Sequence, residues 1–217
     1  MAAIAILGGT GAEGVGLALR FAQIGEEVVI GSRDANRAAE AARRVATAVS
    51  GARVGGAENA AAAEASERIV LALPHAGVEA FLAQHAPAMR GKLVIDVMVP
   101  LRFAGGWCVS VPVAEGSLGE LIQQRAPQAR VVSAFKNLAA EHLQRVDEAL
   151  EGDVLLCGDD DAAKKEVAAL AERIPKLRAI DAGPLSGAAG LERLTVMQLN
   201  INRLHRAVTA VRILGLS

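Results

Sequence analysis

A glycine-rich segment between a buried strand and a helix lies near the start of this chain, and it constrains the fold more than any other feature. Residues 2–7 form an unbroken apolar run, which is typical of a strand buried on both faces of a sheet. Gly9, Gly11 and Gly14 follow with the spacing GxGxxG, and a helical pattern continues from Leu17 to Ile24. In such a unit the glycines allow a tight turn, the approach of backbone N–H groups to a pyrophosphate, and close packing of the helix on its strand. We therefore predict a dinucleotide site at the N-terminus of this helix, the alternative being a glycine-rich turn without a ligand.

Strand and helix patterns alternate four times over the first hundred residues. Because parallel strands need crossover connections, this alternation predicts an α/β fold with a doubly wound parallel sheet. The glycine-rich segment from Leu101 to Val113 interrupts the pattern, and we expect it to be a loop. The pattern of residues 191–214 predicts a long terminal helix. Its apolar side chains are expected to be buried against its own sheet or against a second copy of the chain. Further strands are expected at 27–31, 67–74, 92–97, 130–137, 153–158 and 177–181.

The end of the second strand predicts which nicotinamide cofactor binds. A carboxylate at this place would accept hydrogen bonds from the ribose of NAD and would repel the extra phosphate of NADP. This chain has Ser32 and Arg33 instead, with Arg37 one helical turn further on. A guanidinium can bind a phosphate through two hydrogen bonds, and a hydroxyl can donate another. NADP is therefore the predicted cofactor, the alternative being that Arg33 and Arg37 form a solvated helix face; Asp34 is expected to cap the next helix.

Several side chains follow the other predicted strands, at the edge where open parallel sheets bind ligands. Leu73, Pro74 and His75 come after one strand, and we interpret His75 as a passive loop residue because no partner is visible for it. Lys136 and Asn137 end a later strand and should project toward the same cleft. Apolar walls for this cleft are expected from Leu73, Pro74, Met98, Val99, Phe135, Leu138 and Ala139.

Composition and charge exclude several classes of function. The formal net charge is −1 and no basic stripe interleaves with aromatic residues, so nucleic acid is not expected as a partner. No leader peptide is recognisable and no apolar segment reaches the roughly 20 residues of a membrane span, so we expect a cytoplasmic protein. Cys108 and Cys157 are interpreted as buried thiols, and Asp159, Asp160 and Asp161 as caps of a helix rather than as metal ligands. No metal site and no catalytic nucleophile, acid or base is predicted.

Taken together, the motifs resemble those of the NADPH-dependent reductases of the deazaflavin coenzyme F420. The resemblance is carried by Leu7-Gly8-Gly9-Thr10-Gly11 with Gly14 and Gly16, by Gly31-Ser32-Arg33, by Val132-Ser133-Ala134-Phe135, by Cys157-Gly158-Asp159-Asp160 and by Asp181-Ala182-Gly183-Pro184-Leu185. The motifs occur in the expected order over nearly the whole chain, and the last two are the most specific. The resemblance implies direct hydride transfer between NADPH and F420 in a homodimer. It also implies an NADP-binding Rossmann domain over residues 1–150 and a small C-terminal α/β domain over residues 151–217, ending in a long helix and supplying acceptor-site and dimer contacts.

The same resemblance implies roles for individual residues. The NADP phosphates would be held by Thr10, Gly11, Ala12, Glu13, Ser32, Arg33 and Arg37, next to Gly9 and Gly14 of the turn. Leu73, Val99 and Ala140 would lie along the nicotinamide, with Pro74 and Leu138 near the place where the two rings stack. Lys136 stands where members of the family have histidine, and we expect its charge to steady an anionic ring or an acidic tail of the hydride acceptor. Alanine stands at Ala139, where a proline would be unsurprising.

Two other functions remain open at the level of sequence. The first is an NADPH reductase of a different hydride acceptor, such as a flavin, a quinone, a ferric chelate or a small imine. The second is a non-catalytic regulatory protein that binds NADP and reports the reduced cofactor to a partner. Stereospecific loss of hydride from NADPH in the presence of an acceptor would separate an enzyme from such a sensor.

Overall fold

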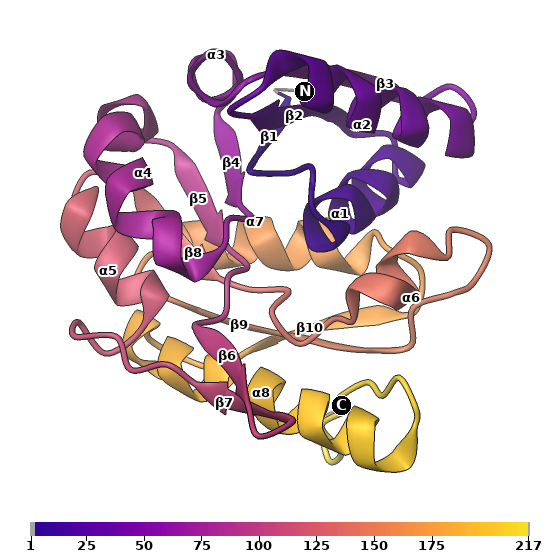
Figure 1. The fold of residues 1–217 in the computed structure, drawn as a ribbon, viewed down its shortest axis with the longest axis vertical. Coiled ribbons are helices and arrows are strands. Elements are labelled where there is room, and N and C mark those ends of the chain that lie inside the picture. The colour runs from indigo at the N-terminus through magenta and orange to yellow at the C-terminus, as the bar shows by residue number, and fades with distance from the viewer. Residues whose placement is uncertain (1–2, 217) are drawn as a thin grey trace.

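An eight-stranded sheet runs through the computed structural model, which describes residues 3–216 (Figure 1). Its strands are β1 (Ile4–Leu7), β2 (Glu27–Ser32), β3 (Arg53–Glu58), β4 (Arg68–Leu71), β5 (Leu93–Asp96), β8 (Arg130–Ser133), β9 (Gly152–Gly158) and β10 (Leu177–Asp181). They lie in the order β10-β9-β8-β5-β4-β1-β2-β3, and every neighbouring pair is parallel except β8 and β9. The predicted α/β fold with a doubly wound parallel sheet is confirmed, except that β9 pairs antiparallel with β8.

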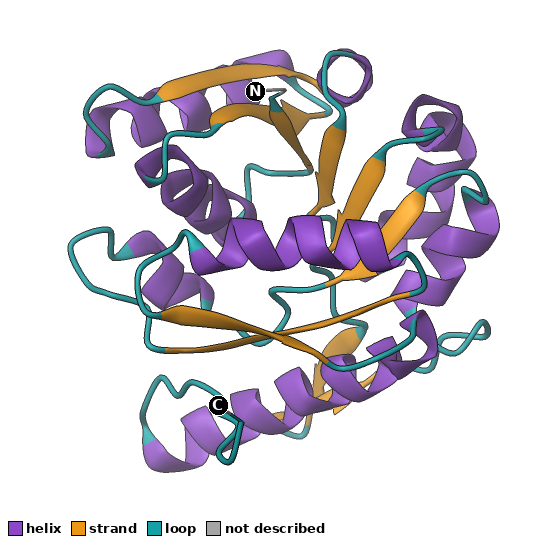
Figure 2. Cartoon of the chain, turned by 180° about the vertical axis from the view of Figure 1, so that it is seen from behind, coloured by secondary structure: helices purple, strands orange, loops and turns teal. Residues whose placement is uncertain are grey.

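Helices cover both faces of this sheet (Figure 2). One apolar cluster joins the sheet to α1 (Ala12–Gln23), α2 (Ala35–Ala48) and α7 (Asp161–Glu172). A second cluster, on the other face, joins it to α3 (Asn59–Glu64), α4 (Val78–His85) and α5 (Leu118–Arg125). The remaining helices are α6 (Ala140–Gln144), α8 (Ala188–His205) and the 3-10 turns η1 (His75–Gly77), η2 (Ala86–Met89) and η3 (Leu185–Gly187). Within residues 3–216, no helix combines the length and the apolar character that a membrane span requires.

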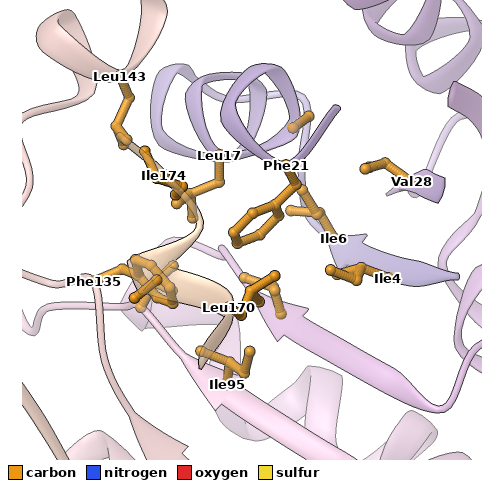
Figure 3. Close-up of a cluster of buried hydrophobic side chains, with 14 of the residues drawn as sticks. Ile4, Ile6, Leu17, Phe21, Val28, Ile95, Phe135, Leu143, Leu170 and Ile174 are labelled. Carbon is orange, nitrogen blue, oxygen red and sulfur yellow. The ribbon is translucent and has the colours of Figure 1, made fainter. Parts of the chain in front are cut away.

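The core shows why the first apolar run forms a strand. Ile4 and Ile6 belong to one cluster, whereas Ala5 and Leu7 belong to the other, because successive side chains of a strand point to opposite faces. Figure 3 shows the first of these clusters, in which Phe21 of α1 meets Phe135 edge to face with ring centroids 5.8 Å apart. This packing fixes the end of β1, and therefore the place where the glycine-rich turn begins.

Local hydrogen bonds confirm two of the predicted helix caps, Asp34 and Asp160, whereas Asp159 and Asp161 do not cap a helix. The Asp34 carboxylate accepts hydrogen bonds from the backbone N–H groups of Asn36 and Arg37 at the start of α2. The Asp160 carboxylate accepts one from Ala163 N at 2.9 Å at the start of α7. Such caps satisfy N–H groups that have no partner inside the helix. The two cysteines are buried free thiols, as predicted.

The prediction of a loop from Leu101 to Val113 is wrong, because this segment holds a β-hairpin. The strands β6 (Leu101–Ala104) and β7 (Trp107–Ser110) pair antiparallel. They are joined by Gly105 and Gly106, which have φ values of 56° and 82°. A two-residue hairpin turn with positive φ at both positions matches the right-handed twist of the strands, and glycine adopts it without strain. The pair of adjacent glycines was the sequence signal for this hairpin.

The long terminal helix is confirmed, but it ends before the predicted residue 214. α8 stops at His205, and Arg206 follows with a φ of 50°. The chain then folds back: Asn202 Oδ1 accepts a hydrogen bond from Thr209 N, and Val211 O accepts one from Asp153 N in β9. The last residues therefore pair with the sheet region instead of extending the helix. The first helix begins earlier than predicted, because α1 starts at Ala12 instead of Leu17.

Candidate active site

A cleft of about 450 Å³ opens at the carboxyl ends of β1, β4, β5 and β8. It is lined by the segments that follow these strands and by two residues of α8, Thr195 and Leu199. β1 lies between β4 and β2, so the connections of the chain leave this part of the sheet in opposite directions. Open α/β sheets bind their ligands at such a point, outside the carboxyl ends of the strands.

The glycine-rich turn forms one end of this edge. Gly9 N donates hydrogen bonds to Ile6 O and Gly31 O, which folds the chain over the end of β1. A Cβ atom added to Gly14 would lie 2.5 Å from the Cα of Gly9, so the turn and α1 approach too closely for a larger residue. A Cβ atom added to Gly11 would meet nothing within 4 Å, and no side chain caps α1 there. The first N–H groups of α1 and an open space beside them suit an anion such as a pyrophosphate.

Thr10 and Ala12 flank Gly11 on this open side of the turn. Thr10 is half-buried and Ala12 is exposed. Their backbone lies at the N-terminus of α1, which begins at Ala12. The structure therefore places the predicted phosphate-binding segment where the positive end of a helix dipole acts.

The end of β2 carries the residues that we expect to select NADP. Ser32 is buried, and its Oγ accepts a hydrogen bond from Asp34 N at 3.2 Å. Arg33 and Arg37 are exposed, and neither guanidinium is paired with an acid among residues 3–216. The Asp34 carboxylate caps α2 through its Oδ1 atom. This end of the sheet thus offers two free cations and a hydroxyl.

The other predicted residues line the cleft itself. Those that follow β4, β5 and β8 are Leu73, Pro74, Met98, Val99, Leu138, Ala139 and Ala140. His75, which we interpreted as a passive loop residue, lies in the same lining. The structure therefore brings together six of the seven side chains that were expected to form apolar walls. Such a lining fits a flat, largely apolar ring system.

Phe135 is the seventh, and its placement in the cleft wall is wrong. It is fully buried and packs against Phe21 in the core, with a φ of 59° that turns the chain after β8. Asn137 also points away from the cleft: its Nδ2 donates to Asp153 O at 2.7 Å. β8 ends at Ser133, and the turn that follows breaks the alternation on which the prediction relied.

Lys136 reaches the cleft lining, but its ammonium group already has partners in the protein. Its Nζ atom lies 2.5 Å from Asp96 Oδ2, donates a hydrogen bond to Met98 O, and lies 3.5 Å from Glu192 Oε1. The side chains of Lys136 and Asp96 are fully buried. The positive charge that we expected for an anionic hydride acceptor is therefore balanced from within.

Sequence reasoning did not identify Glu192 and Asp96 as part of this region. Glu192 accepts a hydrogen bond from Leu118 N at 2.9 Å, and Asp96 accepts one from Ser133 Oγ at 2.8 Å. Burial raises the pKa of Glu192 to about 7, although Lys136 opposes the shift. Asp96 follows three apolar residues in a buried strand, and this was the signal that it needed a cationic partner.

Glu13 also lines the cleft. Its Oε1 atom is enclosed and has no hydrogen-bond partner among the described residues. Burial raises the pKa of its carboxyl to about 8. The side chain of Glu13 therefore adds no positive charge for a phosphate, and the contact expected of this residue falls to its backbone at the start of α1.

Metal ligands are not grouped among the described residues of this region. In the described part of the chain, no group of three or more His, Cys, Asp or Glu residues is arranged to hold a metal ion. The three consecutive acids at 159–161 are engaged separately. Asp159 accepts a hydrogen bond from Leu185 N, Asp160 caps α7, and Asp161 pairs with Lys164.

Comparison with known proteins places these features in one family. Residues 3–100 match the family described as "NADP oxidoreductase coenzyme F420-dependent". The F420-dependent NADP reductase of Methanothermobacter thermautotrophicus is 39% identical over 221 residues, which cover 98% of this chain and 95% of the relative. The F420-dependent NADP reductase of Methanocaldococcus jannaschii is 35% identical over 223 residues, which cover 98% of each protein.

A solved structure extends the similarity to the fold of the whole chain. A crystal structure of an Arthrobacter sp. FB24 protein, provisionally assigned as an F420-dependent NADP-reductase, superposes with a TM-score of 0.84. The two sequences are 30% identical, and the match covers 100% of both chains. The similarity therefore includes the hairpin and α8 as well as the glycine-rich turn.

Proposed function

The chain belongs to the family of F420-dependent NADP reductases, and from this premise we propose that it transfers hydride directly between NADPH and the deazaflavin coenzyme F420. The observation that carries the proposal is the cleft at the strand ends. It has apolar walls and begins beside a glycine-rich turn with free helix N–H groups. A site that aligns two rings needs this combination of one anion-binding end and one apolar end.

The residues present fit NADP. The backbone of Thr10 to Glu13 would hold the pyrophosphate beside the open space at Gly11. Ser32, Arg33 and Arg37 would hold the phosphate that distinguishes NADP from NAD. The nicotinamide would then lie in the part of the cleft formed by Leu73, Pro74, Val99, Leu138 and Ala140.

The protein contributes alignment and exclusion of water to this reaction. NADPH, when bound, supplies the hydride, and the deazaflavin ring accepts it, so no protein nucleophile is required. The apolar walls at Leu73, Met98 and Leu138 would hold the two rings face to face. Lys136 would act indirectly, since its hydrogen bond to Met98 O holds the segment that follows β5.

We further propose that the protein is a homodimer and that residues 151–217 supply the dimer contacts. α8 exposes Met197, Ile201 and Leu204, and the neighbouring hairpin exposes Phe103 and Trp107. An exposed apolar surface of this kind is typical of an interaction site. A second copy is the simplest occupant, because most homo-oligomers pair through the same surface on both subunits.

We also propose the cytoplasm as the location of the protein. The two cysteines in the described residues are free thiols, which suits a reducing compartment. Fractionation of cells that produce the protein at its natural level would test this.

An acceptor screen with the purified protein tests the proposed activity. NADPH absorbance is followed with F420, with a flavin, with a quinone, with a ferric chelate and with a cyclic imine. We expect oxidation of NADPH with F420 and transfer of hydrogen from only one face of C4-deuterated NADPH. Activity with another acceptor but not with F420 would show that the other compound is the substrate instead of F420. Tight NADPH binding without any turnover would support a regulatory NADP-binding protein.

A further inference from the structure

Glu13 is the only carboxylic acid among the described residues that line the strand-end cleft. It lies in the first turn of α1, directly after the glycine-rich segment. The residue as a whole is half-buried, so part of it remains accessible to solvent, but its Oε1 atom is enclosed. A buried polar atom without a partner is costly, and its retention points to a ligand or a reaction that uses it.

Glu13 carries a proton near neutral pH in this environment. Loss of hydration on burial raises the pKa of its carboxyl to about 8, whereas an exposed glutamate would be ionised. The dipole of α1 opposes this shift, since the positive end of a helix favours a carboxylate. The protonated carboxyl is therefore a hydrogen-bond donor that can also release its proton.

The charged groups on neighbouring elements do not neutralise Glu13. Lys136 shares the cleft lining but is bound to Asp96. On α6, which packs against α1, Glu141 is paired with Arg145, and His142 is half-buried. His75 is the remaining titratable group of the lining.

Helix α2 also packs against α1 and carries charges of both signs. These are Arg37, Glu40, Arg43 and Arg44, and all four are exposed. Exposed charges are screened by water and salt. The protonation state of Glu13 is thus set by its burial in the cleft.

From this arrangement, which rests on the proposed function, we propose that Glu13 supplies the proton that accompanies hydride transfer to the deazaflavin. The hydride brings two electrons and one hydrogen to a ring carbon of the acceptor. Glu13 breaks its O–H bond and gives the proton to a ring nitrogen or oxygen, and it becomes a carboxylate. It then regains a proton from water through its accessible part. One NADPH, one proton and one acceptor are consumed, and one NADP⁺ and one reduced acceptor are formed.

The other protonated groups near the cleft are less suited to this step. Loss of a proton from the Lys136 ammonium would leave the buried Asp96 carboxylate without its cationic partner. Glu192 does not line the cleft and is held by Leu118 N. Glu13 combines a free donor, a place in the lining and access to solvent.

The test compares Glu13→Gln, Glu13→Asp and the control Glu64→Gln, which changes an exposed acid on α3. Single-turnover oxidation of NADPH by F420 is measured from pH 6 to 10 in each protein. In the wild type we expect the rate to fall above pH ~8, and Glu13→Gln should be roughly 100-fold slower at pH 7 without that fall. Glu13→Asp should recover part of the rate, and Glu64→Gln should match the wild type. An unchanged rate and pH profile in Glu13→Gln would overturn the proposal.

A second readout does not depend on turnover. Infrared difference spectra of the ligand-free protein should show a protonated carboxyl band that disappears near pH 8 and is missing in Glu13→Gln. NADPH affinity at pH 7 should be nearly equal in both proteins, which also shows that the variant folds. A carboxyl that is already ionised at pH 6 would exclude the role. If the wild type does not reduce F420 at all, the proposed function fails, while the infrared titration still reports on Glu13.

Discussion

Arg33 is the side chain on which the choice between NADPH and NADH should depend. It is exposed at the end of β2, next to the buried Ser32. Replacement of Arg33 by alanine removes charge-assisted hydrogen bonds worth about 1.5–3 kcal/mol, so NADPH should bind roughly 10- to 100-fold more weakly. NADH affinity should change little. Titration of both cofactors checks this, with Arg43→Ala on α2 as the control; equal losses for both cofactors would remove Arg33 from the phosphate site.

Lys136 makes a different kind of contribution, because its charge is used inside the protein. Replacement of Lys136 by methionine leaves Asp96 and Glu192 near each other without their cation. Removing one partner of a buried ion pair costs about 3–5 kcal/mol, so urea unfolding should shift to a much lower concentration. The double variant Lys136→Met/Asp96→Asn should recover part of the loss. Equal stability of Lys136→Met and the wild type would contradict the buried pair.

Glu192 should make stability fall as pH rises. Burial raises its pKa to about 7 from an ordinary value of about 4.5, so the folded protein binds more protons than the unfolded chain between these values. The free energy of unfolding should therefore decrease from pH 4.5 to pH 7 through this group. Denaturant unfolding over this range should show a shallower decrease in Glu192→Gln. Identical slopes in the two proteins would show that Glu192 is already ionised at low pH.

At the scale of elements, the hairpin β6–β7 depends on one side chain of α8. Asn200 Oδ1 accepts a hydrogen bond from Cys108 N, and its Nδ2 donates to Cys108 O, both at 2.9 Å. Trp107 adds a contact, since the Arg203 guanidinium lies 5.5 Å from its ring centroid. The amide of Asn200 thus substitutes for a neighbouring strand and holds the hairpin against α8, and Leu101 of this hairpin lines the cleft.

Replacement of Asn200 by alanine should loosen this hairpin without unfolding the sheet. Two hydrogen bonds worth about 1 kcal/mol each are lost, so the Cys108 amide should exchange with solvent roughly 10-fold faster or more. Hydrogen-exchange mass spectrometry or NMR measures this. Asn36→Ala, in the exposed first turn of α2, is the matched control and should leave the exchange of Cys108 unchanged.

At the scale of the whole molecule, the apolar surface of α8 predicts association. Leu204 is 63% exposed, and Met197 on the same helix is 54% exposed. An aspartate at position 204 would place a charge in an apolar interface, so Leu204→Asp should dissociate the proposed dimer. Sedimentation at micromolar concentration should show a dimer for the wild type and for Thr47→Asp on α2, and a monomer for Leu204→Asp. A monomeric, active wild type would refute the interface.

The fold class and the position of the cofactor site could be predicted because their signals are local. The run before Gly8 has no polar residue, so it must lie inside a sheet, and glycine at 11 and 14 leaves room for an anion and for close helix packing. Asp34 and Asp160 cap helices through contacts with residues two or three positions away. Interactions over such short separations are encoded directly in the order of the residues.

The partners of Lys136 and Asn200, and the burial of Glu13, depend on contacts between distant parts of the chain. Lys136 meets Asp96 from 40 positions away, and Asn200 meets Cys108 from 92 positions away. Neither pairing has a local pattern, because each arises only when the sheet brings separate strand ends and α8 together. The sequence by itself therefore determined the α/β alternation and where a dinucleotide would bind, but not the hairpin β6–β7 or the end of α8. Only the tertiary structure decided which charges are neutralised and which acid remains unpartnered, since burial and distance in space control both.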